Sequence, residues 1–245
     1  DVRAVLAEVE RLAVGPWAAS FGAADRDPPV LDADSASVRV PASFRRSFES
    51  YVEAGWWRLD LPAALGGPPA PPSLRWAVQE LVLGANPALH MYACGYVFAA
   101  VLHELGTPDQ RRLAELMVER GWGASMALTE DLAGSDVGAV STRATPRPDG
   151  SWHLEGVKRF VTNGDHDLTE NIVHFVLARR DGSAPGTKGL SLFVVPRHHV
   201  DLATGDLGER NGVRPTRLED KLGLRVSATC ELAFGTHGTP AVGHL

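Results

Sequence analysis

The sequence has only two cysteines, Cys94 and Cys230, which lie far apart and form no CxxC pair. This sparse use excludes a disulfide framework and predicts reduced thiols. Long apolar runs are also missing. A membrane helix needs about 20 apolar residues in succession, and no stretch of this chain approaches that length. The first residues, Asp1 to Arg3, are unlike a signal peptide. Together these absences predict a cytoplasmic protein with no membrane span.

Basic charge is in the minority. The chain carries 24 Lys and Arg against 30 Asp and Glu, which gives a formal net charge of -6 and a pI near 5.8. The Lys and Arg residues are scattered singly or in pairs, and no basic run is long enough to follow a phosphate backbone. Nucleic acid is therefore not an expected partner.

Several common catalytic motifs are absent. Residues 121–126 read GWGASM, so no glycine stands where the third one of G-x-G-x-x-G would be, and residues 186–189 lack the first glycine of a P-loop. Neither G-x-S-x-G nor HExxH occurs. His198 and His199, and His166 between two aspartates, are better explained by solvated turns than by a metal. We predict no metal site.

The pattern of apolar residues changes near the middle of the 245-residue chain. Helical spacing recurs before Trp122, in residues 2–13, 44–52, 74–82 behind a Ser73 cap, 88–105, and 108–121 behind a Thr107 capping box. After Trp122, short runs rich in β-branched residues predict strands at 151–154, 157–162, 172–179, 190–195 and 231–234. We therefore predict an α+β protein, with an all-helical domain over residues 1–121 and an all-β sandwich or barrel over 122–245.

Two blocks in the second half have the chemistry of a flavin site. Residues 128–137 read LTEDLAGSDV and offer a hydroxyl, main-chain N–H groups and a Gly134-Ser135 corner that a diphosphate can approach. Residues 158–164 read KRFVTNG and supply an aromatic ring and a second hydroxyl. Either block alone is compatible with an ordinary strand and turn. Their joint occurrence, just after the change from helices to strands, favours the flavin interpretation.

In this order and spacing the two blocks resemble the flavin-binding segments of the acyl-CoA dehydrogenase family. The resemblance spans nearly the whole chain, through GWWRLDLPAALGG at 55–67 and LGTPDQ at 105–110. Further matches are GDHDLTENI at 164–172, GTKGLSLF at 186–193, LEDKLGL at 218–224 and SATC at 227–230. These are similar to the subgroup that includes methylmercaptopropionyl-CoA and long-chain acyl-CoA dehydrogenases. The resemblance implies a third domain, a C-terminal four-helix bundle, which this chain lacks.

The resemblance also implies roles for individual residues. Met126, Leu128 and Thr129 match positions beside the pyrimidine end of the flavin ring. Gly134 and Ser135 match the diphosphate contact, and 160–162 match the segment that covers the ring, with the Thr162 hydroxyl near N5. Ser135 is also placed near the CoA part of the substrate. The cofactor-binding residues implied are Met126, Leu128, Thr129, Gly134, Ser135, Phe160, Val161 and Thr162.

Two positions depart from the family pattern. Asp131 stands where proline is usual, which frees the backbone φ and adds a negative charge close to a diphosphate. A lower flavin affinity is the expected consequence. Phe160 stands where tryptophan is more common, which keeps an aromatic face but removes the indole N–H. Flavin binding is expected to survive that change.

The implied activity is FAD-dependent oxidation of an acyl-CoA to the trans-2-enoyl-CoA in fatty acid β-oxidation. An electron-transfer flavoprotein is the implied acceptor, and a homodimer or homotetramer the implied assembly. The base comes from the missing bundle, so no catalytic residue is assigned and this stretch alone is expected to be inactive. Two alternatives stay open: an acyl-CoA oxidase or nitroalkane-oxidase relative, and a truncated module that binds acyl-CoA or a protein without catalysis.

Overall fold

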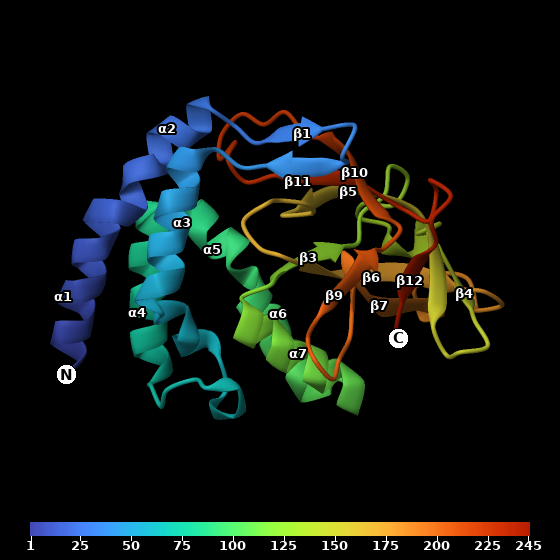
Figure 1. Ribbon diagram of the computed structural model, residues 1–245, viewed down its shortest axis with the longest axis horizontal. Helices are drawn as coiled ribbons and strands as arrows, with labels where there is room; N and C mark the ends of the chain where they lie inside the picture. The colour runs from blue at the N-terminus through green and yellow to red at the C-terminus, as the bar shows by residue number, and fades with distance from the viewer. The chain divides into compact units, whose positions relative to one another are not determined.

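The computed structural model describes residues 1–245, which divide into two compact units (Figure 1). The helical unit comprises Asp1–Val30, Arg39–Gly123 and Asp220–Ser227. The strand unit comprises Leu31–Val38, Ala124–Glu219 and Ala228–Leu245. Each unit therefore takes in a segment from a distant part of the sequence. The fold is α+β, with helices preceding strands.

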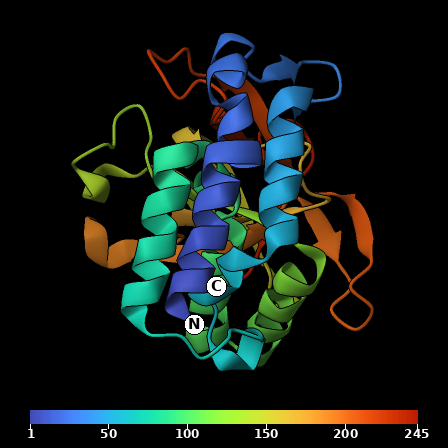
Figure 2. The same cartoon turned by 90° about the vertical axis from the view of Figure 1, so that its left-hand side faces the viewer.

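The helical unit contains seven α-helices. They are α1 (Val2–Leu12), α2 (Phe21–Arg26), α3 (Ala42–Ala54), α4 (Pro72–Ala85), α5 (Pro87–Tyr92), α6 (Cys94–Leu105) and α7 (Pro108–Arg120). Figure 2 shows α1, α3 and α4 side by side. Aromatic rings fill the space between elements: Trp17 meets Tyr51 edge to face at 5.4 Å between ring centroids, and Phe44 meets Tyr92 at 5.2 Å. The segment Asp220–Ser227 is attached by the Tyr92 hydroxyl, which donates to the Val226 carbonyl at 2.8 Å.

The start of α7 confirms the predicted capping box. The Gln110 N–H donates to the Thr107 hydroxyl at 3.3 Å, and the Thr107 N–H donates back to the Gln110 side chain at 2.9 Å. These two bonds satisfy donors that the first turn of a helix would otherwise leave without acceptors. The helix ends at Gly121 in a left-handed conformation, φ +63°.

Two helix predictions were wrong in detail. Ser73 does not cap α4, because the helix begins one residue earlier, at Pro72, with Pro71 in the N-cap position. The apolar run at 88–105 is not one helix but two, α5 and α6, separated at Ala93. The second helix then brings Gly95 against the main chain of Trp122, where a Cβ atom would lie 2.1 Å from the carbonyl oxygen.

The main sheet of the strand unit has eight strands and mixed pairing. Its order is β10-β11-β5-β4-β6-β3, with β12 paired to β5 and β7 paired to β6. The strands are β3 (Gly123–Ala127), β4 (Arg143–Pro146), β5 (Trp152–Thr162), β6 (Ile172–Arg180), β7 (Leu190–Pro196), β10 (Val213–Leu218), β11 (Thr229–Phe234) and β12 (Ala241–Gly243). Two small hairpins stand apart, β1 (Val30–Asp32) with β2 (Ser37–Arg39) and β8 (His198–Val200) with β9 (Leu207–Arg210).

The separate strands predicted at 151–154 and 157–162 are one strand, β5. Its first half pairs with β4 and β12, and its second half with β11. Gly156, which lies between the two predicted strands, is a point of close approach: a Cβ atom there would lie 2.4 Å from the Thr142 hydroxyl oxygen. A glycine inside a strand often marks such a crowded place rather than a turn.

The strand unit contains two fully buried histidines, His166 and His174. His174 on β6 is 0% exposed, and its Nδ1 lies 2.8 Å from the Ser125 hydroxyl of β3. Burial lowers the pKa of His174 to about 3, and the positive charges of Arg197 and Arg210 act in the same direction. The imidazole is therefore neutral at physiological pH, and its hydrogen bond links β6 to β3.

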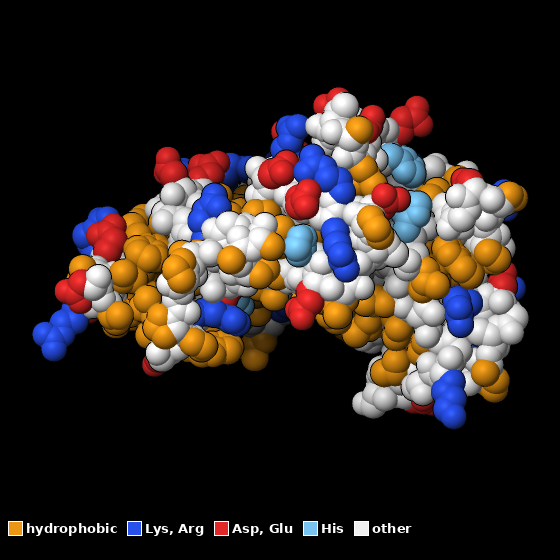
Figure 3. Space-filling view, turned by 90° about the horizontal axis from the view of Figure 1, so that it is seen from below, with side chains coloured by type: hydrophobic (Ala, Val, Ile, Leu, Met, Phe, Trp, Pro, Cys, Tyr) orange, Lys and Arg blue, Asp and Glu red, His pale blue; other side chains and the backbone are white.

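A membrane-spanning helix, a surface patch of one charge and a metal-binding cluster would each indicate another kind of function. None of the helices combines the length and the hydrophobicity of a bilayer-spanning segment. On the face in Figure 3, positive and negative side chains are interspersed among hydrophobic ones. No group of three or more His, Cys, Asp or Glu side chains is arranged so that it could hold a metal ion.

Gly84 and Gly95 form a matched pair for testing the packing of the helical unit. A Cβ at Gly84 in α4 would meet no atom within 4 Å, whereas one at Gly95 in α6 would overlap the Trp122 carbonyl. We expect Gly84→Ala to raise the free energy of unfolding by up to about 1 kcal/mol, because alanine is the better helix former. Gly95→Ala should lower it by about 1–3 kcal/mol through overpacking. Chemical denaturation measures both, and equal effects would contradict the close approach at Gly95.

His174 should make stability depend on pH below neutrality. Its pKa is about 3 in the folded chain against an ordinary value of 6.5 for histidine, so the unfolded chain binds more protons between these values. Stability is then fully present above pH 6.5 and falls as the pH drops, by up to about 1.4 kcal/mol per pH unit. His174→Gln should flatten this slope. An imidazole NMR titration of the folded protein with a midpoint near 6.5 for His174 would show the assignment to be wrong.

Candidate functional site

The two blocks singled out in the sequence lie side by side in the strand unit. The Arg159 N–H of β5 donates to the Thr129 carbonyl at 2.8 Å. One residue earlier, the Lys158 ammonium donates to the Leu128 carbonyl at 2.9 Å. Two segments 30 residues apart in the sequence are thus joined at two adjacent main-chain carbonyl groups.

Glu130 is the centre of a dense hydrogen-bond network. Its side chain is 7% exposed and that of Lys158 is 0% exposed, and the two are joined at 2.8 Å. Four further donors reach the carboxylate: the N–H and hydroxyl of Ser141 at 2.8 and 2.6 Å, and those of Thr142 at 2.9 and 2.6 Å. Burial opposes ionisation, but the bonds from Lys158, Ser141 and Thr142 outweigh it and lower the pKa of Glu130 to about 2. Glu130 therefore ties both ends of the 130–142 loop to β5.

Between those two ends, residues 134–137 are exposed. Glu130 and Ala133 exchange main-chain hydrogen bonds at 3.1 Å in both directions, which closes a tight turn. Gly134 and Ser135 follow it and are exposed. A Cβ at Gly134 would meet no atom within 4 Å, so the room above this corner is available to a ligand.

A β-bulge in β5 presents the aromatic ring. Val161 pairs with Cys230 and Lys158 with Leu232, so two residues of β5, Arg159 and Phe160, face one residue of β11. Phe160 takes a left-handed conformation, φ +57°, which a bulky side chain rarely adopts. Phe160 is 56% exposed, and the Arg159 guanidinium carbon lies 4.9 Å from the centroid of its ring.

The predicted site residues fall into three groups by exposure. Met126, Gly134, Ser135, Phe160 and Thr162 are exposed, Leu128 and Thr129 are half-buried, and Val161 is 1% exposed. The Val161 side chain therefore belongs to the core, and only its main chain can contact a ligand. The hydroxyls of Thr129, Ser135 and Thr162 make no hydrogen bond within the chain, which leaves them free to bind one. Direct hydrogen bonds join the 128–130 segment to β5, whereas Gly134 and Ser135 are held only through the loop.

Asp131 has a partner that the sequence analysis did not consider. Its carboxylate lies 2.7 Å from the Arg159 guanidinium, which also contacts Glu219 at 2.6 Å and Glu231 at 3.4 Å. The charge expected to repel a diphosphate is therefore paired. Because the Asp131 side chain is 67% exposed, the pair adds little stability, but it restrains the loop at the position where proline would otherwise do so.

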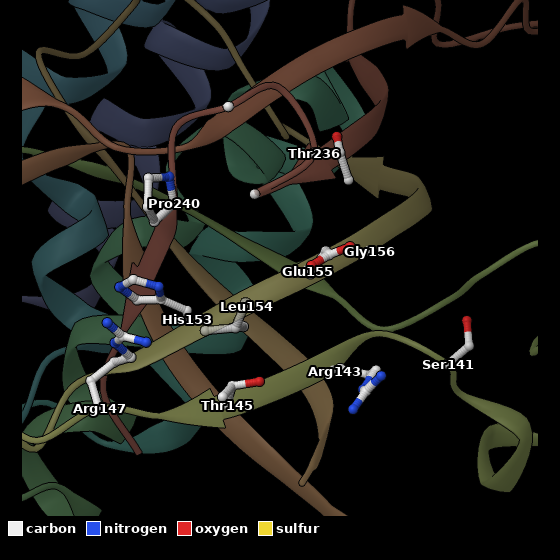
Figure 4. Close-up of a pocket in the computed structure, with 12 residues that line it drawn as sticks. Ser141, Arg143, Thr145, Arg147, His153, Leu154, Glu155, Gly156, Thr236 and Pro240 are labelled. Carbon is white, nitrogen blue, oxygen red and sulfur yellow. The ribbon is translucent and has the colours of Figure 1, made fainter.

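A hollow of about 580 Å³ lies elsewhere in the strand unit, over β4, β5 and residues 235–240 (Figure 4). Its charged side chains include Arg143, Arg147 and Glu155. Arg143 is already paired with Asp181 at 3.0 Å. None of the eight predicted flavin residues lines this hollow, although Ser141, which donates to Glu130, lies at its edge.

The donor set of the candidate site fits a flavin. A flavin needs hydrogen-bond donors at its polar ring edge, apolar contact with the ring faces and donors for its diphosphate. Thr129 and Thr162 supply hydroxyl groups, Met126 and Phe160 supply exposed apolar surface, and the Gly134-Ser135 corner is open for a diphosphate. The residues present are therefore suitable to hold FAD.

Three comparisons place the chain among known proteins. Residues 125–236 match the family model "Acyl-CoA dehydrogenase, middle domain". The broad-specificity linear acyl-CoA dehydrogenase FadE5 of Mycobacterium tuberculosis is 57% identical over 99% of this chain, and 3-methylmercaptopropionyl-CoA dehydrogenase of Ruegeria pomeroyi is 35% identical over 82%. The chain spans 40% and 34% of the lengths of these two relatives.

A solved structure agrees with this fold. The acyl-CoA dehydrogenase of Bacillus anthracis, solved in complex with FAD, matches 100% of this chain with a TM-score of 0.69 and 20% identity, over 38% of its own length. The extent of the FadE5 similarity, the match of the strand unit to the family's middle domain and the shared fold support one conclusion. The chain belongs to the acyl-CoA dehydrogenase family.

Proposed function

We propose that this chain forms the N-terminal helical domain, residues 1–121, and the middle β domain, residues 122–245, of an FAD-dependent acyl-CoA dehydrogenase. The observation that carries the proposal is the junction at 128–130 and 158–160. There, hydrogen bonds from Lys158 and Arg159 set two groups of ligand-binding residues next to each other. The exposed Phe160 ring and the unbonded Thr129 hydroxyl lie at this junction.

In the proposed function each group has a physical task. The Thr129 and Thr162 hydroxyls donate to the polar edge of the cofactor ring, and preorganised donors of this kind favour the negative charge that reduction adds. Met126 and Phe160 exclude water from the ring faces. The Gly134-Ser135 corner receives the diphosphate, and Ser135 also approaches the CoA moiety. FAD, when bound, supplies the hydride acceptor for oxidation of the acyl chain to the trans-2-enoyl thioester.

Glu130 is unsuited to the role of catalytic base. With five donors around its carboxylate and a pKa of about 2, it does not accept a proton near neutral pH. The family resemblance assigns the base to the C-terminal bundle, and this chain spans only 40% of FadE5. We therefore attribute catalysis to the full-length protein and expect residues 1–245 alone to be inactive.

The substrates and partners follow from the relatives. Their names specify linear acyl-CoA and methylmercaptopropionyl-CoA thioesters, so we propose an acyl-CoA substrate and a place in fatty acid β-oxidation. An electron-transfer flavoprotein is the proposed acceptor. A cytoplasmic homodimer or homotetramer is the proposed form of the full-length protein.

Flavin binding by the full-length protein tests the proposal. We expect the purified protein to show flavin absorbance that bleaches anaerobically on addition of a linear acyl-CoA. Thr129→Val and Thr162→Val should each weaken FAD binding by roughly fivefold to tenfold, since a lost hydrogen bond costs about 1 kcal/mol. Thr236→Val, an exposed threonine at the hollow over β4 and β5, is the matched control and should bind FAD as the wild type does.

Three results would count against the proposal. A protein that binds no flavin at all is not a dehydrogenase of this type. A flavoprotein that no acyl-CoA bleaches has another substrate, and one that consumes oxygen on addition of acyl-CoA would be an oxidase rather than a dehydrogenase.

A further inference from the structure

The buried Lys158 has a second contact besides Glu130. Its ammonium donates to the Leu128 carbonyl at 2.9 Å while it holds the Glu130 carboxylate at 2.8 Å. Lys158 is 0% exposed, so neither bond competes with water. An ammonium in this position draws the Leu128 carbonyl oxygen inward, toward the interior of the strand unit.

The inward carbonyl fixes the direction of the next N–H group. In a planar trans peptide the C=O and N–H bonds point in opposite directions, so the Thr129 N–H points away from Lys158. It has no acceptor within the chain. The following carbonyl, that of Thr129, is held by the Arg159 N–H at 2.8 Å, which fixes the peptide on the other side. Thr129 is thus restrained at both of its peptide bonds.

We propose that Glu130 and Lys158 are positioning residues of the flavin site. Lys158 holds the Leu128 carbonyl and thereby orients the Thr129 N–H and hydroxyl outward. Glu130 holds Lys158 in place and also anchors the 130–142 loop at Ser141 and Thr142. Neither side chain reaches a ligand, because both are buried. This inference rests on the proposed function, since it assigns the ligand of Thr129 as FAD.

The alternative is that the pair only stabilises the fold. A buried ion pair is poor evidence for net stability, because desolvation of the two charges offsets most of their attraction. Removing one partner nevertheless destabilises a protein, since it leaves the other charge buried alone. Stability alone therefore does not separate the two roles, and the properties of the bound flavin are needed.

The test compares Glu130→Gln, Lys158→Met and the double variant with Asp181→Asn, all in the full-length protein. Asp181 is the matched control because it accepts from Arg143 at 3.0 Å and Thr145 at 2.6 Å in the same unit, away from both flavin blocks. The double variant removes both charges together, so it leaves no unpaired charge buried. FAD affinity, the flavin reduction potential and the melting temperature of the flavin-free protein are measured for each.

A positioning role predicts FAD binding about tenfold weaker, or more, in all three variants, the equivalent of 1.4 kcal/mol. The reduction potential should become more negative, because misaligned donors stabilise the reduced ring less. The double variant should regain melting temperature relative to Lys158→Met without regaining affinity or potential. Asp181→Asn should match the wild type in both.

Three other outcomes can be distinguished from the result expected for a positioning role. Folded variants with wild-type affinity and potential would overturn the positioning role and leave the proposed function intact. Loss of folding in all three variants would also overturn it, since the pair would then serve the fold itself. A wild-type protein without flavin would instead refute the proposed function, and this inference with it.

Discussion

A single buried carboxylate constrains the candidate site. Glu130 accepts five hydrogen bonds, so its ionised form is satisfied in a place where an unpaired charge would cost several kcal/mol. Because the donors come from the loop end at 141–142 and from β5, the carboxylate can be satisfied only when both are in place. The exposed residues 134–137 are therefore connected to a hydrogen-bonded anchor at each end of the loop. This arrangement leaves Gly134 and Ser135 exposed without leaving their anchors mobile.

The sequence was most informative where local chemistry decides the structure. The Thr107 capping box, with its glycine stop at Gly121, needs only contacts within one helix, and it forms as predicted. The predictions that were wrong depend on partners distant in the sequence. Gly156 lies in the gap between two predicted strands, but a glycine is required there by the approach of Thr142. The division of α5 from α6 accompanies the contact of Gly95 with Trp122. Neither contact leaves a trace in the local pattern.

At the candidate site, the residues that point outward could be identified from the motifs, and the residues that support them could not. Thr129 and Phe160 belong to a recognisable pattern, whereas Lys158 and Glu130 were not expected to be buried. One signal was available: alternation along β5 places position 158 on the same side as Leu154, which is in the core. A lysine on the inner face of a strand requires a buried acceptor. The acceptor, Glu130, lies 28 positions earlier in the sequence, and only the fold brings it next to Lys158.

The backbone of Phe160 shows how stability and function divide along β5. A left-handed conformation costs a non-glycine residue about 1–2 kcal/mol. Burial of the Phe160 side chain does not offset this cost, because the residue is 56% exposed. The neighbouring residues stabilise the strand against this cost, because Lys158 and Val161 are buried and paired with β11 on either side of the bulge. A chain that needed only a stable sheet would have glycine or asparagine at this position. An exposed aromatic ring held in a strained bulge by buried neighbours is instead suited to contact with a ligand outside the strand unit.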